Sequence, residues 1–315
     1  MSRIVLATDF STSAHRAREW AVYLATALKA ELDVLHVMEI YPGMDVEYPV
    51  NAAYLDYTRK EAATQLAQVV THIGSRVTVA GAEVLMGMPS AHIIAYAEKQ
   101  QAELVVMGTQ GRTGLAHVFL GSTAERVVKG APCPVCTVRD PGSSGGPSAS
   151  VPVSVRRILL SLDWSACSQA VVDYATDLAC TLKAAVTVLH VLEPVTYGLD
   201  FTLGHSEERE QSRQRAIERA QQVVHALGIR GVSADQDIRG GLPADSIVDA
   251  VRTRDCQMIV MGTHGRRGWS HLAYGSVAEA VLRRAQCPVL TVRCQKPGPG
   301  LEAEVVSPLV RPLPA

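Results

Sequence analysis

The sequence lacks three features that would assign it to a narrow class of proteins. It has no excess of either charge: the net charge is -1, which gives no basic surface for nucleic acid or an anionic membrane. It has no apolar run long enough to span a bilayer. Its seven cysteines, an odd number scattered over 315 residues, do not indicate a disulfide framework. With 47% hydrophobic and 19% charged residues, the composition predicts a globular protein with neither nucleic acid nor membrane as partner.

The first residues also lack the pattern of a signal peptide. "MSRIVLATDFS" shows no basic region, apolar stretch and cleavage site, and runs straight into a strand-like segment. Cysteines outside any disulfide framework favour a reducing compartment. We therefore expect a cytoplasmic location.

One module is present twice. The stretch "VVMGTQGRTGLAHVFLGSTAERVV" at 105–128 returns as "IVMGTHGRRGWSHLAYGSVAEAVL" at 259–282. Other anchors keep the same offset of 154 residues: Asp9 and Asp163, His36 and His190, Pro89 and Pro243, Arg139 and Arg293. A constant offset along the whole module predicts a duplicated domain. We expect domains at 1–140 and 154–294, a Gly/Ser/Pro-rich linker at 141–153 and a Pro-rich tail at 295–315.

Short apolar strands alternate with helical patterns in each copy. In the first copy, strand-like runs lie at 3–8, 32–37, 82–86, 104–108 and 134–139. A long amphipathic helix is expected around 55–73, and another from about Ser90 to Gln101. Continuous apolar strands separated by helices are typical of a parallel sheet covered on both faces. The predicted fold class is therefore α/β, with two tandem doubly wound domains of about five parallel strands each. Such sheets bind ligands at the carboxyl ends of their strands.

The glycine-rich stretch begins where the fourth strand of each copy ends. Glycine allows positive φ and lets an anion approach the backbone without a Cβ in the way. Gly121-Ser122 then begins a helix, whose free N–H groups and dipole favour a phosphate. A merely permissive loop is the alternative for one copy alone. Recurrence of the same glycine spacing in both copies favours a phosphate cradle.

These motifs resemble the ATP-binding universal stress proteins. The spacing G-x2-G-x9-G-[ST] occurs at 108–122 and again at 262–276, and "ATDFS", "CPVCTVR" and "CPVLTVR" are also similar to that family. The resemblance covers both copies and implies a tandem-domain member with a Rossmann-like, adenine nucleotide alpha-hydrolase-like fold. It implies ATP or another adenine nucleotide as cofactor, with or without Mg2+.

The resemblance also implies a set of nucleotide-binding residues. Those near the end of the first strand would border the adenosine, the second-strand valine would meet the adenine edge, and the glycine loop and helix start would hold ribose and phosphates. In the first copy they are Ala7, Asp9, Val37, Gly108, Thr109, Gln110, Gly111, Arg112, Thr113, Gly114, Gly121, Ser122, Thr123 and Ala124. In the second copy they are Ser161, Asp163, Val191, Gly262, Thr263, His264, Gly265, Arg266, Arg267, Gly268, Gly275, Ser276, Val277 and Ala278. Trp164 replaces Phe10, so the second site is expected to differ in shape.

Several residues also have simpler interpretations. Arg112 and Arg266 fit a phosphate role and a solvated loop arginine equally well. His36 and His190 follow apolar strand residues and are expected to be hydrogen-bonded structural histidines. Cys133 and Cys136 spell C-x2-C, but only Cys133 recurs in the second copy, so we predict no metal site.

Three functions remain open at this stage. Neither glycine stretch contains the lysine of a Walker loop, which favours binding without efficient catalysis. Together with this absence, the family resemblance implies a nucleotide-dependent regulator of stress or growth arrest with a regulatory protein partner. We assign no catalytic residue in this first hypothesis. The second is a slow ATP hydrolase that uses Asp9 and Asp163 with a bound metal. The third is a flavin-binding electron carrier on a similar fold.

The last strand of each copy raises a question of assembly. An unpaired edge strand invites pairing with another strand. We expect the strands at 134–139 and 288–293 to pair inside the chain, as the family resemblance implies from the pairing of subunits. We also expect two chains to form a homodimer.

Overall fold

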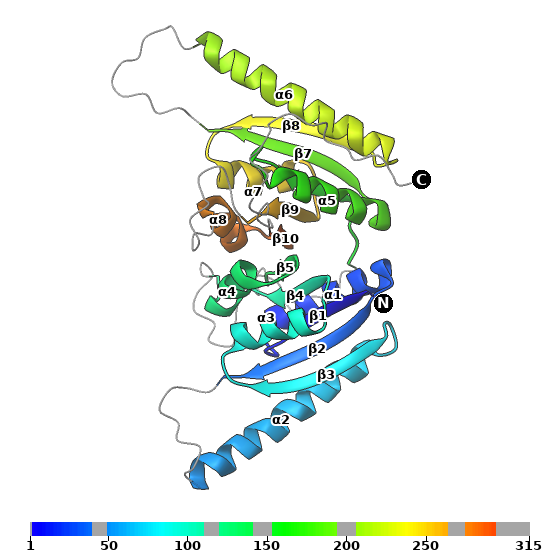
Figure 1. Ribbon diagram of the computed structural model, residues 1–315, viewed down its shortest axis with the longest axis vertical. Helices are drawn as coiled ribbons and strands as arrows, with labels where there is room; N and C mark the ends of the chain where they lie inside the picture. The colour runs from blue at the N-terminus through cyan, green and yellow to red at the C-terminus, as the bar shows by residue number, and fades with distance from the viewer. Residues whose placement is uncertain are drawn as a thin grey trace, which may run out of the picture. The chain divides into compact units, whose positions relative to one another are not determined.

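The computed structural model describes residues 2–39, 49–109, 120–140, 153–193, 206–263 and 275–293. The chain divides into two compact units (Figure 1). The first unit holds 1–154 together with 282–291, and the second holds 155–281 and 292–315. Within the described residues, no helix combines the length and apolar character that crossing a membrane requires.

The first copy alternates strands and helices as the apolar pattern predicts. Its elements are β1 (Arg3–Ala7), α1 (Thr12–Leu28), β2 (Glu31–Met38), α2 (Pro49–Ile73), β3 (Val79–Met86), α3 (Pro89–Lys99), β4 (Leu104–Gly108), α4 (Ser122–Gly130) and β5 (Val135–Val138). The expected helix at 55–73 is α2, which begins earlier, and the helix expected from Ser90 to Gln101 is α3. Figure 1 shows these elements in blue to green.

The strands of the first copy form a parallel sheet in the order β3-β2-β1-β4-β5. Val5, Val34 and Val105 are fully buried, as continuous apolar strands require when both faces are covered. Helix α1 packs on β1 and β4, α2 packs along β2 and β3, and α3 packs beside α4. The strand order reverses between β1 and β4, so the carboxyl ends of these two strands flank the crevice where such sheets bind ligands.

The second copy repeats this arrangement. Its elements are β6 (Arg157–Ser161), α5 (Ser168–Leu182), β7 (Ala185–Leu192), α6 (Ser206–Ile229), β8 (Ala234–Gly240), α7 (Pro243–Thr253), β9 (Met258–Gly262), α8 (Ser276–Arg284) and β10 (Val289–Val292). Strands β9, β6, β7 and β8 lie side by side in that order and are parallel. The predicted doubly wound α/β fold is confirmed.

Both copies make the same turn between the third strand and the following helix. Gly87 and Gly241 adopt φ of 141° and 127°, which a residue with a Cβ rarely adopts. Pro89 and Pro243 then occupy the first turn of α3 and α7, where the missing N–H costs no helical hydrogen bond. The glycine and proline at these positions therefore fix where each helix begins.

Within the first unit, β10 lies antiparallel to β5. Cys136 is opposite Leu290 at the centre of this pairing. On either side, the Thr137 hydroxyl donates to the Val289 carbonyl at 3.3 Å and the Thr291 hydroxyl donates to the Val135 carbonyl at 3.2 Å. The 154-residue offset relates these two bonds, so β5 and β10 contribute equivalent contacts.

Candidate functional site

The turn after β1 is held by the side chain of Asp9. Its Oδ1 accepts hydrogen bonds from the Ser11 backbone N–H at 3.1 Å and from the Ser11 hydroxyl at 2.6 Å. Ser11 is in turn the N-cap of α1 and accepts from the Ala14 N–H at 3.3 Å. Asp9 therefore places the first turn of α1 at the carboxyl edge of the sheet.

Asp163 holds the corresponding turn in the second copy. Its Oδ1 accepts from the Ser165 N–H at 3.0 Å and from the Ser168 hydroxyl at 3.4 Å. The residue between the carboxylate and the serine has positive φ in both copies: 63° at Phe10 and 60° at Trp164. Aromatic residues rarely adopt this conformation, so the surrounding contacts must hold it.

Those contacts include the strand-end histidines. The His36 Nδ1 donates to the Thr8 carbonyl at 2.7 Å, and the ring lies 4.4 Å from the ring of Phe10 between centroids. His190 bonds the Leu162 carbonyl at 2.7 Å and lies 5.2 Å from Trp164. Because a carbonyl only accepts, Nδ1 carries the proton in both rings. The prediction that these histidines are hydrogen-bonded structural residues is confirmed.

Glycine is needed at the end of β4 because of close packing, and not because of the backbone conformation that was expected at Gly108. Glycines at positive φ in the described residues are Gly87, Gly231 and Gly241, so the interpretation that Gly108 turns the chain at positive φ is wrong. A Cβ on Gly108 would lie 2.4 Å from the Ser13 hydroxyl oxygen and 3.1 Å from the Ala14 nitrogen. Gly108 is therefore needed because the first turn of α1 packs directly on it.

The two ends of the glycine loop are tied together. The Thr109 N–H donates to the Val138 carbonyl at 3.0 Å, and the Gly121 N–H donates to the Thr109 carbonyl at 2.8 Å. In the second copy the Gly275 N–H donates to the Thr263 carbonyl at 3.1 Å. The loop thus leaves and re-enters the sheet edge at a single point, directly before the following helix.

The start of α4 has no side-chain cap. Gly121 is the N-cap, with φ -60° and ψ 140°, and has no side chain to satisfy the first N–H groups of the helix. Nearby, the hydroxyl of Thr109 is buried without a hydrogen-bond partner among the described residues. Uncapped N–H groups and an unsatisfied hydroxyl are donors suited to an anion.

The described residues of the predicted site fall into two groups. Ala7 pairs with Leu35 on one side and Met107 on the other, so it lies in the strand-order switch with the Asp9 turn, Gly108 and the loop ends. Val37 lies on the next strand, opposite Leu85. Ser161, Asp163, Val191, Gly262, Thr263, Gly275, Ser276, Val277 and Ala278 occupy the equivalent elements of the second copy. The loop residues Gln110, Gly111, Arg112, Thr113, Gly114, His264, Gly265, Arg266, Arg267 and Gly268 lie outside the described residues.

Ser13 is a site residue that sequence reasoning missed. It is buried, its hydroxyl lies 3.1 Å from that of Ser11, and it packs against Gly108. Its counterpart in the second copy is Cys167 rather than serine, so comparison of the two copies gave no signal for it.

Both cysteines of the C-x2-C motif are buried. Burial raises the pKa of Cys133 to about 11. Burial, with the neighbouring Cys287, raises the pKa of Cys136 to about 12. Among the described residues no cluster of His, Cys, Asp or Glu is suited to a metal ion.

The chain is similar to known proteins along almost its whole length. A universal stress protein of Mycobacterium tuberculosis is 25% identical over 299 residues, which cover 92% of this chain and 96% of that protein. A universal stress protein of Methanocaldococcus jannaschii is 35% identical over 143 residues, 44% of this chain and 82% of that protein. The crystal structure of a universal stress protein from Archaeoglobus fulgidus superposes with a TM-score of 0.63 at 19% identity, and covers 92% of this chain and 98% of that one.

The family comparison agrees with the internal repeat. The model of the universal stress protein family matches twice, at residues 1–139 and 154–293. Each match contains the aspartate-held turn, the tied loop ends and the helix that follows them. The chain therefore belongs to the universal stress protein family, with two tandem copies of its domain.

Proposed function

We propose that each copy binds an adenine nucleotide at the strand-order switch, and that occupancy makes the chain a nucleotide-dependent regulator of a stress or growth-arrest response. The observation that carries the proposal is the start of α4. There the helix N–H groups after Gly121 have no side-chain cap, beside the unsatisfied buried hydroxyl of Thr109. This combination fits the phosphate end of a nucleotide.

Different residues around the start of α4 would bind the phosphates, the base and the ribose. The N–H groups of Ser122, Thr123 and Ala124 would hold the phosphates, with the exposed Ser122 hydroxyl as an additional donor. Val37, in the neighbouring strand, is placed to present backbone groups to the base. The Asp9 turn would close the ribose side. The phosphates would add negative charge at a helix start whose acidic residue, Glu125, pairs with Lys129 at 2.6 Å.

Asp9 and Asp163 are assigned in this proposal to shaping the site rather than to hydrolysis. The Oδ1 of Asp9 accepts two hydrogen bonds that hold the turn, and the Oδ1 of Asp163 accepts two in the same way. Both carboxylates therefore have a positioning role in this proposal.

The proposed regulator works in the cytoplasm as a homodimer or as a single chain with its two copies paired through their last strands. The test is to denature the purified protein, identify any released nucleotide and measure its molar ratio to the chain. Titration of the nucleotide-free protein with ATP, ADP and AMP by calorimetry would rank them. Failure of all three to bind would overturn the proposal.

A further inference from the structure

One residue breaks the buried stripe of α2. Leu55, Ala62, Leu66, Val69 and Ile73 follow one another at helical spacing and are all buried against the sheet. Arg59 occupies the same stripe, four residues after Leu55 and three before Ala62. Unlike the other residues of the stripe, Arg59 is exposed, so the cavity that it lines opens to solvent on this side.

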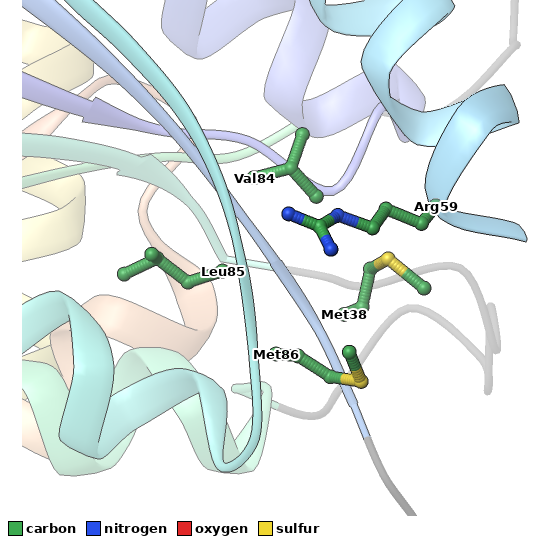
Figure 2. A pocket seen from close by; sticks show the side chains of 5 residues that line it. All are labelled: Met38, Arg59, Val84, Leu85 and Met86. Carbon is green, nitrogen blue, oxygen red and sulfur yellow. The ribbon is translucent and has the colours of Figure 1, made fainter. Parts of the chain in front are cut away.

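Arg59 lines a cavity of about 230 Å³ together with Met38, Val84, Leu85 and Met86. Met38 of β2 lies opposite Met86 of β3 in the sheet register. Figure 2 shows the Arg59 guanidinium on the same side of these strands as Val84, Met38 and Met86, whereas Leu85 points to the other side. Val84, Met38 and Met86 thus form an apolar floor of the cavity, and the Arg59 guanidinium lies at its side.

The charge of Arg59 is not matched within the described residues. It makes no ion pair or hydrogen bond with any of them, and the nearby acidic groups of α2 have other partners. Asp56 pairs with Lys60 at 2.8 Å, and Glu61 accepts from Gln65 at 2.9 Å. Arg59 also has a purely structural interpretation, in which its methylene groups cover apolar surface while its guanidinium is solvated. This interpretation predicts no bound ligand.

The second copy differs at these positions. Arg59 corresponds to Arg213, but Met86 corresponds to Gly240 and Leu85 to Arg239. Arg239 is engaged by Asp237 at 2.9 Å and by Asp249 at 2.8 Å. The methionine floor therefore belongs to the first copy, and the second copy provides an internal control.

We infer that this cavity is a binding site, separate from the nucleotide site, for a small amphiphile with one carboxylate and an unbranched apolar tail. The carboxylate pairs with Arg59 and the tail lies on Val84, Met38 and Met86. Flexible, polarisable methionines adapt to tails of differing length. Adjacent strand residues point to opposite faces of a sheet, so Met38 lies on the α2 face and Val37, assigned to the adenine, on the other.

The probe is a series of straight-chain carboxylates, from butanoate to octanoate, kept below their micelle concentrations. Binding is followed through methyl signals of methionine in protein labelled at its eight Met residues. The Met38 and Met86 signals should shift on titration, and those of Met258 and Met261 in β9 should not. Each added methylene that enters the cavity should tighten binding by up to about fourfold.

Ligands of the same chain length but different charge distinguish this site from non-specific apolar binding. Octylamine and octanol should bind at least tenfold more weakly than octanoate. Arg59→Gln should remove that preference, and Arg213→Gln, the matched change in the second copy, should leave it intact. ATP should not displace octanoate. Absence of any shift at Met38 and Met86, equal binding of octanol and octanoate, or displacement by ATP would each overturn the inference. Loss of ATP binding alone would overturn only the proposed function.

Discussion

The carboxylate of Asp33 on β2 lies 2.8 Å from the position that a Cβ on Gly81 of β3 would occupy. Asp33 is fully buried and accepts from the Arg3 guanidinium at 3.1 Å. In the second copy the corresponding carboxylate is on β8, the equivalent of β3, instead of on β7, the equivalent of β2. Thr187 and Asp235 stand at the positions of Asp33 and Gly81, and Arg157 donates to both, at 3.0 Å and 2.8 Å. The equivalent arginines, Arg3 and Arg157, thus each pair with a carboxylate of this strand pair in either arrangement.

This exchange predicts a compensating pair of substitutions. Gly81→Asp alone should lower the free energy of unfolding by roughly 2 to 4 kcal/mol, because it overpacks the strand pair and places two carboxylates together. Gly81→Asp combined with Asp33→Thr should recover part of that loss. The recovery is incomplete because the Tyr96 hydroxyl would still lie 3.2 Å from the new Cβ, whereas the second copy has Ala250 at that position. Urea unfolding of the four proteins measures the coupling between the sites. Additive losses would show that the exchange is unrelated to the packing.

Gly108→Ala should destabilise the first copy by about 1 to 3 kcal/mol. The new methyl group would meet both the Ser13 side chain and its backbone, and the backbone cannot rotate away. Adding Ser13→Ala should therefore restore only part of the loss. Thermal unfolding of the single and double variants decides this, and full recovery would mean that only the serine hydroxyl obstructs the methyl group.

Gly121→Val should act on binding rather than on folding. The backbone of Gly121, at φ -60° and ψ 140°, is one that valine adopts readily. Its side chain would nevertheless cover the first N–H groups of α4. We expect an unchanged unfolding midpoint and the loss of one of two nucleotide sites per chain. Gly275→Val is the matched change in the second copy and should remove the other site.

The salt-bridge network on β8 predicts a dependence of stability on pH. Burial alone would raise the pKa of Asp237, but hydrogen bonds from Arg254 and Arg239 outweigh it and hold that pKa below its ordinary value. The resulting stabilisation is present above the ordinary aspartate pKa of about 4 and is lost as the pH falls through the lower folded pKa. The difference in unfolding free energy between wild type and Asp237→Asn should therefore be larger at pH 6 than at pH 2.5. A constant difference would contradict the assignment.

The architecture could be predicted well from the sequence because the same pattern of strands and helices occurs in both copies. Local sequence patterns determine the strands, the turn at Gly87 and Pro89 and the long helix that ends at Ile73. Such patterns can be recognised from neighbouring residues alone. The family resemblance, drawn from the glycine spacing and the strand-end motifs, is confirmed by the two matches to the family model.

The contacts between distant residues could not be predicted in this way. Asp33 on β2 and Gly81 on β3 are separated in the sequence by helix α2, and only the sheet register brings them together. The close approach of Ser13 to Gly108 likewise depends on how α1 packs on β4, so the glycine was assigned to backbone conformation rather than to packing. The nucleotide assignments were not tested by the structure and stay predictions.

The central claim is that the starts of α4 and α8 each hold an adenine nucleotide. Its most direct test is the nucleotide stoichiometry of wild type beside the Gly121→Val and Gly275→Val double variant. Calorimetry on nucleotide-free protein should find two adenine-nucleotide sites per wild-type chain and none in the double variant. Absence of binding to the wild type, or full binding by a double variant that unfolds at the wild-type temperature, would contradict the account.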